Sequence, residues 1–177
     1  MDKLTFTVAN NHHAAEIARL HTLSWQQTYH EMLKADYLNN LAPQERLALW
    51  QARLSEPTDN QYVLMAEIDN NLAGFICVYA DKDSEYGSLL DNLHVASHYH
   101  GKGIAKQLIA KAVTWLNTHA KHPALHLEVL AGNHNAIKVY QKLGGQNIKQ
   151  GVWHAPCGSL VDEYIYLWPN KHSLTNL

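Results

Sequence analysis

The 177 residues are 46% hydrophobic and 17% charged, with a formal net charge of −2 at pH 7. This balance suits one globular domain and excludes disorder, and it offers no basic surface for nucleic acid or an anionic membrane. Two cysteines are too few for a disulfide framework, no stretch approaches the roughly 20 apolar residues of a membrane span, and the N-terminus lacks a signal-peptide pattern. We therefore expect a cytoplasmic protein whose single domain fills residues 1–177, with a core over about 3–168 and a loose tail at 169–177.

Hydrophobic periodicity places the elements along the chain. Strands are expected at 4–8, 62–68, 72–80, 87–95, 125–130, 146–153 and 160–167. Helical stretches are expected at about 11–29, 32–41, 43–55, 104–119 and 133–143. The order, β-α-α-β-β-β-α-β-α-β-β, predicts an α/β (α+β mixed) fold with a central, mainly antiparallel sheet of about seven strands flanked by helices.

A short glycine loop, His100-Gly101-Lys102-Gly103-Ile104-Ala105, joins the strand end Leu93-His94-Val95 to a helix. Glycines let a ligand approach the backbone, and the first N–H groups of a helix are unpaired and carry partial positive charge, so the loop is suited to a phosphate. It is not a Walker A loop, and Lys106 stands where a dinucleotide fingerprint needs its third glycine. By itself, the loop could equally be a plain strand-to-helix connection.

A second segment runs from Asn133 to Gly144. Asn133 is placed to cap a helix, and Ala136 and Tyr140, four residues apart, share a face of it. Alone, this segment reads as a capped amphipathic helix.

Together and in this order, the two segments resemble the GNAT superfamily of N-acetyltransferases. The resemblance rests on the Leu-x-Val strand end, the glycine loop and an Asn-x-x-Ala-x-x-x-Tyr-x-x-x-Gly helix about 30 residues later. It is close over residues 93–145 and loose over about 3–168. Two residues depart from the pattern: His100 replaces the usual Arg or Gln, and Gly145 replaces an aromatic residue.

The resemblance implies acetyl-CoA as co-substrate, with its pyrophosphate on the backbone N–H groups of the loop and its pantetheine arm along the strand end. Lys102 and Lys106 would add charge, Asn133 would hydrogen-bond the cofactor, and Tyr140 would lie near the sulfur. The residues expected at the cofactor are Leu93, His94, Val95, His100, Gly101, Lys102, Gly103, Ile104, Ala105, Lys106, Asn133, Ala136 and Tyr140.

The implied reaction is direct transfer of the acetyl group to a primary amine of a small molecule or peptide. The Val95 N–H would hold the oxyanion, and Tyr140 would protonate the departing thiolate, the alternative being a tyrosine that only packs. The candidate bases are Asp91, Asn92, His94 and Glu128, with Asp91 as first choice. Strand alternation is expected to place Asp91 and Leu93 on one face, with Asn92 and His94 on the other.

The resemblance implies that the first helices and the last hairpin bind the acceptor, and the residues expected there are Trp25, Tyr29, Trp153 and His154. The 13 histidines lack metal-site spacing, so no metal is expected. The resemblance also leaves a homodimer open. Two other functions stay open: a CoA-binding regulatory module without turnover, and a transferase for a different acyl group.

Overall fold

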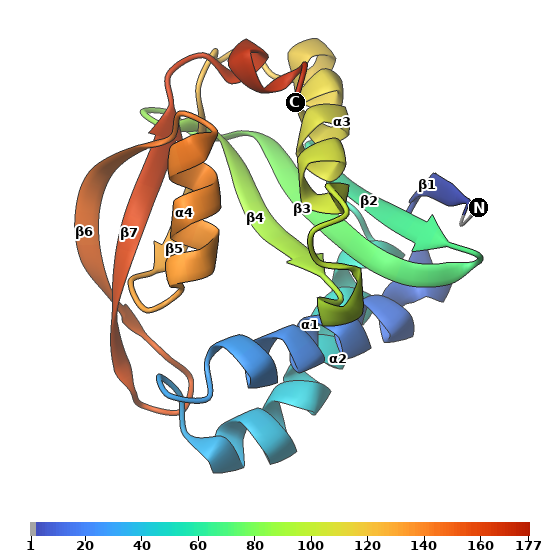
Figure 1. The fold of residues 1–177 in the computed structure, drawn as a ribbon, viewed down its shortest axis with the longest axis vertical. Coiled ribbons are helices and arrows are strands. Elements are labelled where there is room, and N and C mark those ends of the chain that lie inside the picture. Colours follow the sequence, from blue (N-terminus) through green and yellow to red (C-terminus); the bar gives the residue numbers. More distant parts are fainter. Residues whose placement is uncertain (1–2) are drawn as a thin grey trace.

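A single seven-stranded sheet forms the centre of the computed structural model, which describes residues 3–177 (Figure 1). The predicted domain also includes residues 1 and 2, which lie outside the described residues. The strands follow the spatial order β1-β2-β3-β4-β5-β7-β6. Their bounds are β1 Leu4–Val8, β2 Gln61–Ile68, β3 Asn71–Asp83, β4 Gly87–Val95, β5 Leu125–Leu130, β6 Gln146–His154 and β7 Leu160–Trp168.

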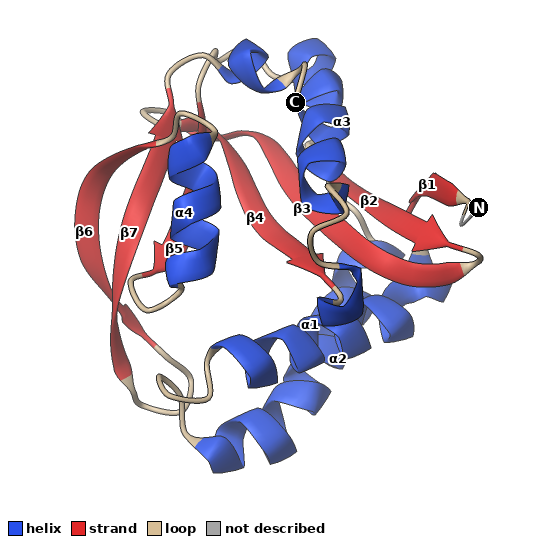
Figure 2. Ribbon diagram, in the orientation of Figure 1, coloured by secondary structure: helices blue, strands red, loops and turns tan. Residues whose placement is uncertain are grey.

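Four α-helices flank the sheet (Figure 2). They are α1 Ala14–Thr28, α2 Ala42–Ser55, α3 Ile104–His119 and α4 His134–Lys142. No helix within residues 3–177 has both the length and the apolar character that a membrane crossing requires. The predicted fold class, a mixed α/β fold with a mainly antiparallel sheet, is confirmed.

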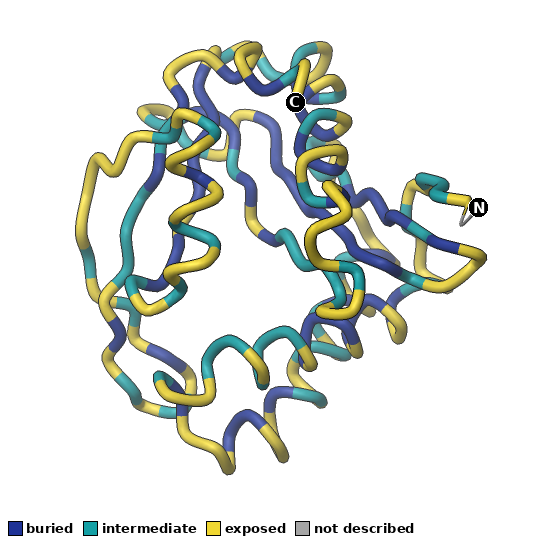
Figure 3. The backbone as a smooth tube through the Cα atoms, viewed as in Figure 1, coloured by how far each residue is buried: buried dark blue, intermediate teal, exposed yellow. Residues whose placement is uncertain are grey.

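Alternation along the strands divides the core between the two faces of the sheet. On one face, Leu64, Ile76 and Val78 pack with the buried stripe of α3. On the other, Met65 and Phe75 pack with residues of α1 and α2 such as Trp50. Figure 3 shows the result: β3 is largely buried between the two layers, whereas β6, at the sheet edge, is mostly exposed.

All strand pairs are antiparallel except β4 with β5. These two parallel strands are paired only at Ser88–Leu125 and Leu89–His126. Beyond these pairs they separate, and Figure 1 shows β4 running away from β5. The second half of β4 therefore has β3 on one side and no strand on the other.

Two predicted segments differ from the structure. Residues 32–41 are not a separate helix: Met32 and Leu33 lie in turns that hydrogen-bond to the Tyr29 carbonyl, and a π-helical segment (Tyr37–Leu41) leads straight into α2. The apolar residues here pack instead on a third cluster with Leu130 and Val161, so tertiary packing overrides the local periodicity.

The tail after residue 168 is also ordered, contrary to the prediction. Lys171–Leu174 form a 3-10 turn, in which the Leu174 side chain is 1% exposed and packs on the α3 face of the core. Lys171 is buried as well, and its Nζ donates to the His122 carbonyl at 2.5 Å. One apolar anchor and one satisfied ammonium are enough to fix a tail that looks polar in sequence.

Candidate active site

The glycine loop has the backbone conformation of an anion site. Gly101 and Gly103 have φ values of +80° and +75°, in the left-handed region that favours glycine. A Cβ added at either would have no atom within 4 Å, so the space beside the loop is open. Gly103 is the N-cap of α3 and provides no side-chain cap, which leaves the first N–H groups of a 16-residue helix available to a ligand. These groups fit a pyrophosphate.

Two side chains beside the loop have local partners. His100 Nε2 lies 2.8 Å from the Val95 carbonyl oxygen, which joins the loop to the end of β4. The Lys102 ammonium lies 5.3 Å from the centre of the Tyr99 ring. The loop is therefore held to the strand end that precedes it.

The end of β4 directs main-chain groups toward the gap beside β5. Ala96 N–H donates to the Ala73 carbonyl, which marks Ala73 and Ala96 as a hydrogen-bonded pair. Hydrogen-bonded and non-bonded pairs alternate along an antiparallel ladder, so Gly74–Val95 and Ile76–Leu93 are non-bonded pairs. The N–H and C=O groups of Leu93 and Val95 therefore point away from β3, toward the side where β4 has no partner strand.

Asn133 and Tyr140, both predicted at the cofactor, lie at the start of α4 and within it. The Asn133 side chain caps the helix, its Oδ1 accepting from the Ala136 N–H at 3.3 Å, as predicted. Tyr140 is 8% exposed and packs against Tyr166 and Trp168. Burial, and to a lesser extent the nearby Tyr29, raise the pKa of Tyr140, so its phenol stays protonated at neutral pH.

A β-bulge changes the predicted alternation in β4. Cys77 pairs with Asn92 while Val78 pairs with Leu90, so Asp91 is the extra residue of the bulge. Leu93 packs in the α3-side core, whereas Asp91 and Asn92 both line a pocket on the other face. The prediction that Asp91 and Leu93 share a face is therefore wrong, because the bulge shifts the alternation by one residue.

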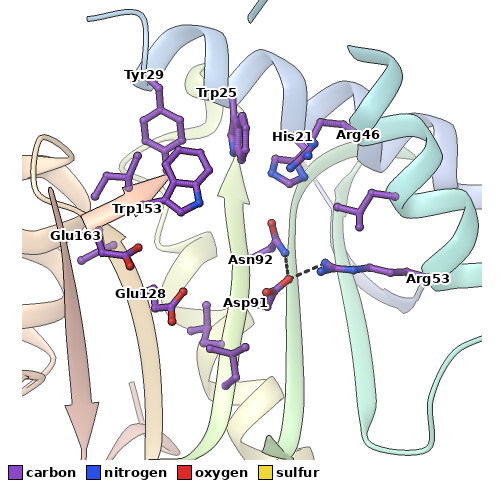
Figure 4. Close-up of a pocket in the computed structure, with 15 residues that line it drawn as sticks. His21, Trp25, Tyr29, Arg46, Arg53, Asp91, Asn92, Glu128, Trp153 and Glu163 are labelled. Carbon is purple, nitrogen blue, oxygen red and sulfur yellow. Dashed lines mark hydrogen bonds and ion pairs between the residues drawn. The ribbon is translucent and has the colours of Figure 1, made fainter. Parts of the chain in front are cut away.

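Asp91 is held by two neighbours. Arg53 Nη1 donates to Asp91 Oδ2 at 2.6 Å, and the Asn92 side-chain amide donates to the same oxygen (Figure 4). Burial acts against the charge of Arg53, but Asp91 and other neighbours raise its pKa overall. This ion pair closes the wall of the pocket near α2.

The pocket encloses about 260 Å³ and lies among α1, α2 and four strands of the sheet. Three of the four predicted acceptor residues, Trp25, Tyr29 and Trp153, line it side by side (Figure 4). Their rings form one aromatic wall, with centroids 5.6 Å apart for Trp25–Tyr29 and 6.0 Å for Trp25–Trp153. The fourth, His154, is exposed at the end of β6 and does not line this pocket.

The strands beside the aromatic wall bear two carboxylates. Glu128 of β5 pairs with Ile165, and Glu163 of β7 pairs with Leu130, so the two glutamates are diagonal neighbours on one face. No ion pair within residues 3–177 involves either one. Burial first, and the charge of Glu128 second, raise the pKa of Glu163.

The sequence analysis did not identify four ionisable residues of this pocket: His21, Arg46, Arg53 and Glu163. His21 could have been found, because it precedes Trp25 and Tyr29 at four-residue spacing on α1. Nothing local marks the other three, which reach the pocket only through the packing of α2 and the pairing of β7.

The tyrosine of the aromatic wall links the pocket to α4. Burial raises the pKa of Tyr29, and a hydrogen bond with the Asn133 side chain opposes that shift.

His94, predicted at the cofactor, points its ring toward this side of the sheet, with Nδ1 2.8 Å from Ser24 Oγ and its ring centroid 4.6 Å from that of His21. Burial lowers the pKa of His94 to about 4. Within residues 3–177, no three His, Cys, Asp or Glu side chains are grouped to hold a metal ion.

Comparisons with known proteins agree with this geometry. The model of the acetyltransferase (GNAT) family matches residues 9–145. YuaI of Bacillus subtilis (strain 168), named as an uncharacterized N-acetyltransferase, is 24% identical over 166 residues, covering 92% of this chain and 91% of its own. A shorter match of 67 residues, 31% identical, links 37% of this chain to 44% of a probable spermine N(1)-acetyltransferase of Bacillus subtilis subsp. natto.

A solved structure shows the same fold. The acetyltransferase yncA of Salmonella typhimurium, solved with its cofactor acetyl-CoA, superposes with a TM-score of 0.67 at 18% identity, over 94% of this chain and 93% of its own. The family model covers well over half of the sequence and includes both the glycine loop and α4. The chain therefore belongs to the acetyltransferase (GNAT) family and is an acyltransferase enzyme.

Proposed function

We propose that the enzyme transfers the acetyl group of acetyl-CoA directly to the primary amine of a small molecule or peptide. One observation carries the proposal: unpaired main-chain groups lie in sequence along a single path. The uncapped N-terminus of α3 suits the pyrophosphate, and the outward-facing main-chain groups of Leu93 and the N–H of Val95 suit the amides of the pantetheine arm. The Val95 carbonyl is left out because it already lies 2.8 Å from His100 Nε2. That path borders the two strands whose separation leaves room for a thioester.

The acyl-transfer step then follows from the chemistry of the groups around this path. A neutral amine attacks the thioester carbonyl, and the Val95 N–H, which points into the gap, donates to the developing oxyanion. The C–S bond breaks, and Tyr140 gives its proton to the departing thiolate. Burial keeps this phenol protonated at neutral pH, as a general acid requires.

The attacking amine must also lose a proton. Asp91 stays the first prediction from sequence, but one of its oxygens already accepts from Arg53 and Asn92. The Glu128–Glu163 pair has no cationic partner within residues 3–177, and the raised pKa of Glu163 brings it closer to neutral pH. We assign proton removal to this pair. The partial match to a spermine acetyltransferase agrees with an amine acceptor.

The first test is calorimetric titration with acetyl-CoA, with CoA and ATP as comparisons. We expect micromolar binding of acetyl-CoA and CoA and no response to ATP, because the loop lacks a Walker A pattern. Thiol release is then followed against a panel of primary amines. Binding without release for any amine would favour a regulatory CoA-binding module. Absence of binding would remove the cofactor assignment.

A further inference from the structure

The acceptor pocket has opposite electrostatic character on its two sides. Glu128 and Glu163 lie on the side formed by β5 and β7, whereas His21, Arg46 and Arg53 lie on the side formed by α1 and α2 (Figure 4). Since Arg53 is already paired with Asp91, the groups left for a ligand on the helical side are His21 and Arg46. We call these two residues the donor wall, and the two glutamates the acidic wall.

His21 is fixed as a neutral hydrogen-bond donor. Its side chain is 2% exposed, and its Nδ1 accepts from the Trp50 indole N–H at 3.0 Å. An indole can only donate, so Nδ1 carries no proton and Nε2 must carry one. Burial, followed by the charges of His94, Arg46 and Arg53, lowers the pKa of His21, which keeps the ring neutral. Within residues 3–177, nothing accepts from Nε2.

Arg46 is the second donor, and its charge is poorly matched inside the protein. The nearest carboxylate, Glu45, lies 3.8 Å away and already accepts from the Tyr37 hydroxyl at 2.6 Å. The buried Nε of Arg46 has no hydrogen-bond partner among the described residues. Its guanidinium carbon lies over the Trp25 ring, 4.4 Å from the centroid, and 15% of the Arg46 side chain is exposed.

The acidic wall has the opposite need: its two carboxylates lack a cation within the described residues. Glu128 and Glu163 repel each other across the ladder and have no cation among residues 3–177, so an ammonium group would relieve the repulsion. The aromatic wall of Trp25, Tyr29 and Trp153 lies between the two charged walls and offers ring faces to the body of a ligand.

On the basis of the proposed function, we propose that the acceptor is a small zwitterion, an amino acid or a close analogue. Its amine would face the acidic wall, and its carboxylate would accept from His21 Nε2 and the Arg46 guanidinium. A polyamine satisfies only the acidic wall, because a second ammonium would meet Arg46 and the donor N–H of His21.

The test compares each amino acid with its carboxamide, which lacks only the carboxylate, and with polyamines, which carry a second amine and no carboxylate. Rates of thiol release are measured for L-amino acids, for the carboxamide of each one, and for putrescine and spermidine. We expect kcat/KM to be at least about tenfold higher for an amino acid than for its carboxamide, a difference typical of one charge-assisted hydrogen bond. This comparison uses the unmodified enzyme and needs no variant to fold.

Arg46 variants test the assignment of the wall. Arg46→Gln is expected to bring the ratio of kcat/KM for acid over carboxamide toward one, whereas Arg46→Lys should retain part of it. Arg19→Gln is the matched control: Arg19 is exposed on α1 and does not line this pocket, so the ratio should not change.

The outcomes separate this inference from the proposed function. Acetylation of polyamines or carboxamides in preference to amino acids would overturn the zwitterion and leave the acetyltransferase intact. A ratio unaffected by Arg46→Gln would overturn the role of the donor wall. If acetyl-CoA binds but no amine of any class is acetylated, both proposals fail together.

Discussion

The proposed cofactor site and the proposed acceptor pocket are built in different ways. The glycine loop and the end of β4 form one continuous stretch of chain, and they present mainly backbone groups. The acceptor pocket takes side chains from α1, α2, β4, β5, β6 and β7. A backbone site depends on local conformation and binds groups common to many proteins. A side-chain site can change its ligand without disturbing the fold, so specificity is expected to lie there.

The largest expected effect comes from changing the backbone site itself. Gly103→Val places a β-branched residue at φ +75°. This left-handed conformation costs an ordinary residue about 1–2 kcal/mol, and it costs a β-branched residue more. We expect the loop to leave this conformation and turn its N–H groups away, weakening acetyl-CoA binding about 100-fold or more by calorimetry.

Gly144→Val is the matched control for this change. Gly144 also has a positive φ, +83°, and a Cβ there likewise meets no atom within 4 Å. It follows the C-terminus of α4 and should therefore show a similar loss of stability with little loss of binding. Equal binding by the Gly103→Val protein would show that the loop is only a turn.

The next effect concerns Tyr140, the proposed general acid. Tyr140→Phe removes the proposed acid and leaves the ring packing, so kcat should fall about 100-fold while the Kd for acetyl-CoA stays within about twofold. The control is Tyr166→Phe, which removes a hydroxyl bonded to Gln141 in the same aromatic cluster. If both variants lose the same activity, Tyr140 acts through packing and not as an acid.

The same division explains what the sequence could predict. The bounds of α3 and β5 agree with the predicted 104–119 and 125–130, because each is a regular apolar pattern closed by glycine or proline. The glycine loop can be proposed from sequence because its residues are contiguous, and its cofactor role stays a prediction. The bulge at Asp91 cannot be predicted in this way, since it depends on the register of β4 against β3.

Local sequence patterns identify only some of the residues of the proposed acceptor pocket. Trp25 and Tyr29 are predictable because the family resemblance points to the first helices as acceptor-binding elements, whereas Arg46 and Glu163 lie on elements that meet only in the folded chain. The ordered tail has the same cause: Leu174 is an apolar residue in a mainly polar stretch, and its packing on the core depends on the position of α3.

The smallest expected effect is on stability, and it tests whether the acidic wall is built for a ligand at a cost to the fold. Because burial and Glu128 raise the pKa of Glu163, the folded protein holds that proton more tightly than the unfolded chain does. Ionised Glu163 therefore destabilises the fold at neutral pH, and this destabilisation fades as pH falls through the raised pKa toward 4.5, the ordinary value.

Glu163→Gln should raise the free energy of unfolding by about 0.2–1 kcal/mol near neutral pH in urea titrations, with the difference shrinking in acid, while turnover falls. Asp162→Asn, an exposed neighbour on the opposite face of β7, should show neither change. A Glu163→Gln protein that is less stable than the parent at neutral pH would mean that this carboxylate supports the fold, and the acidic wall would then be structural.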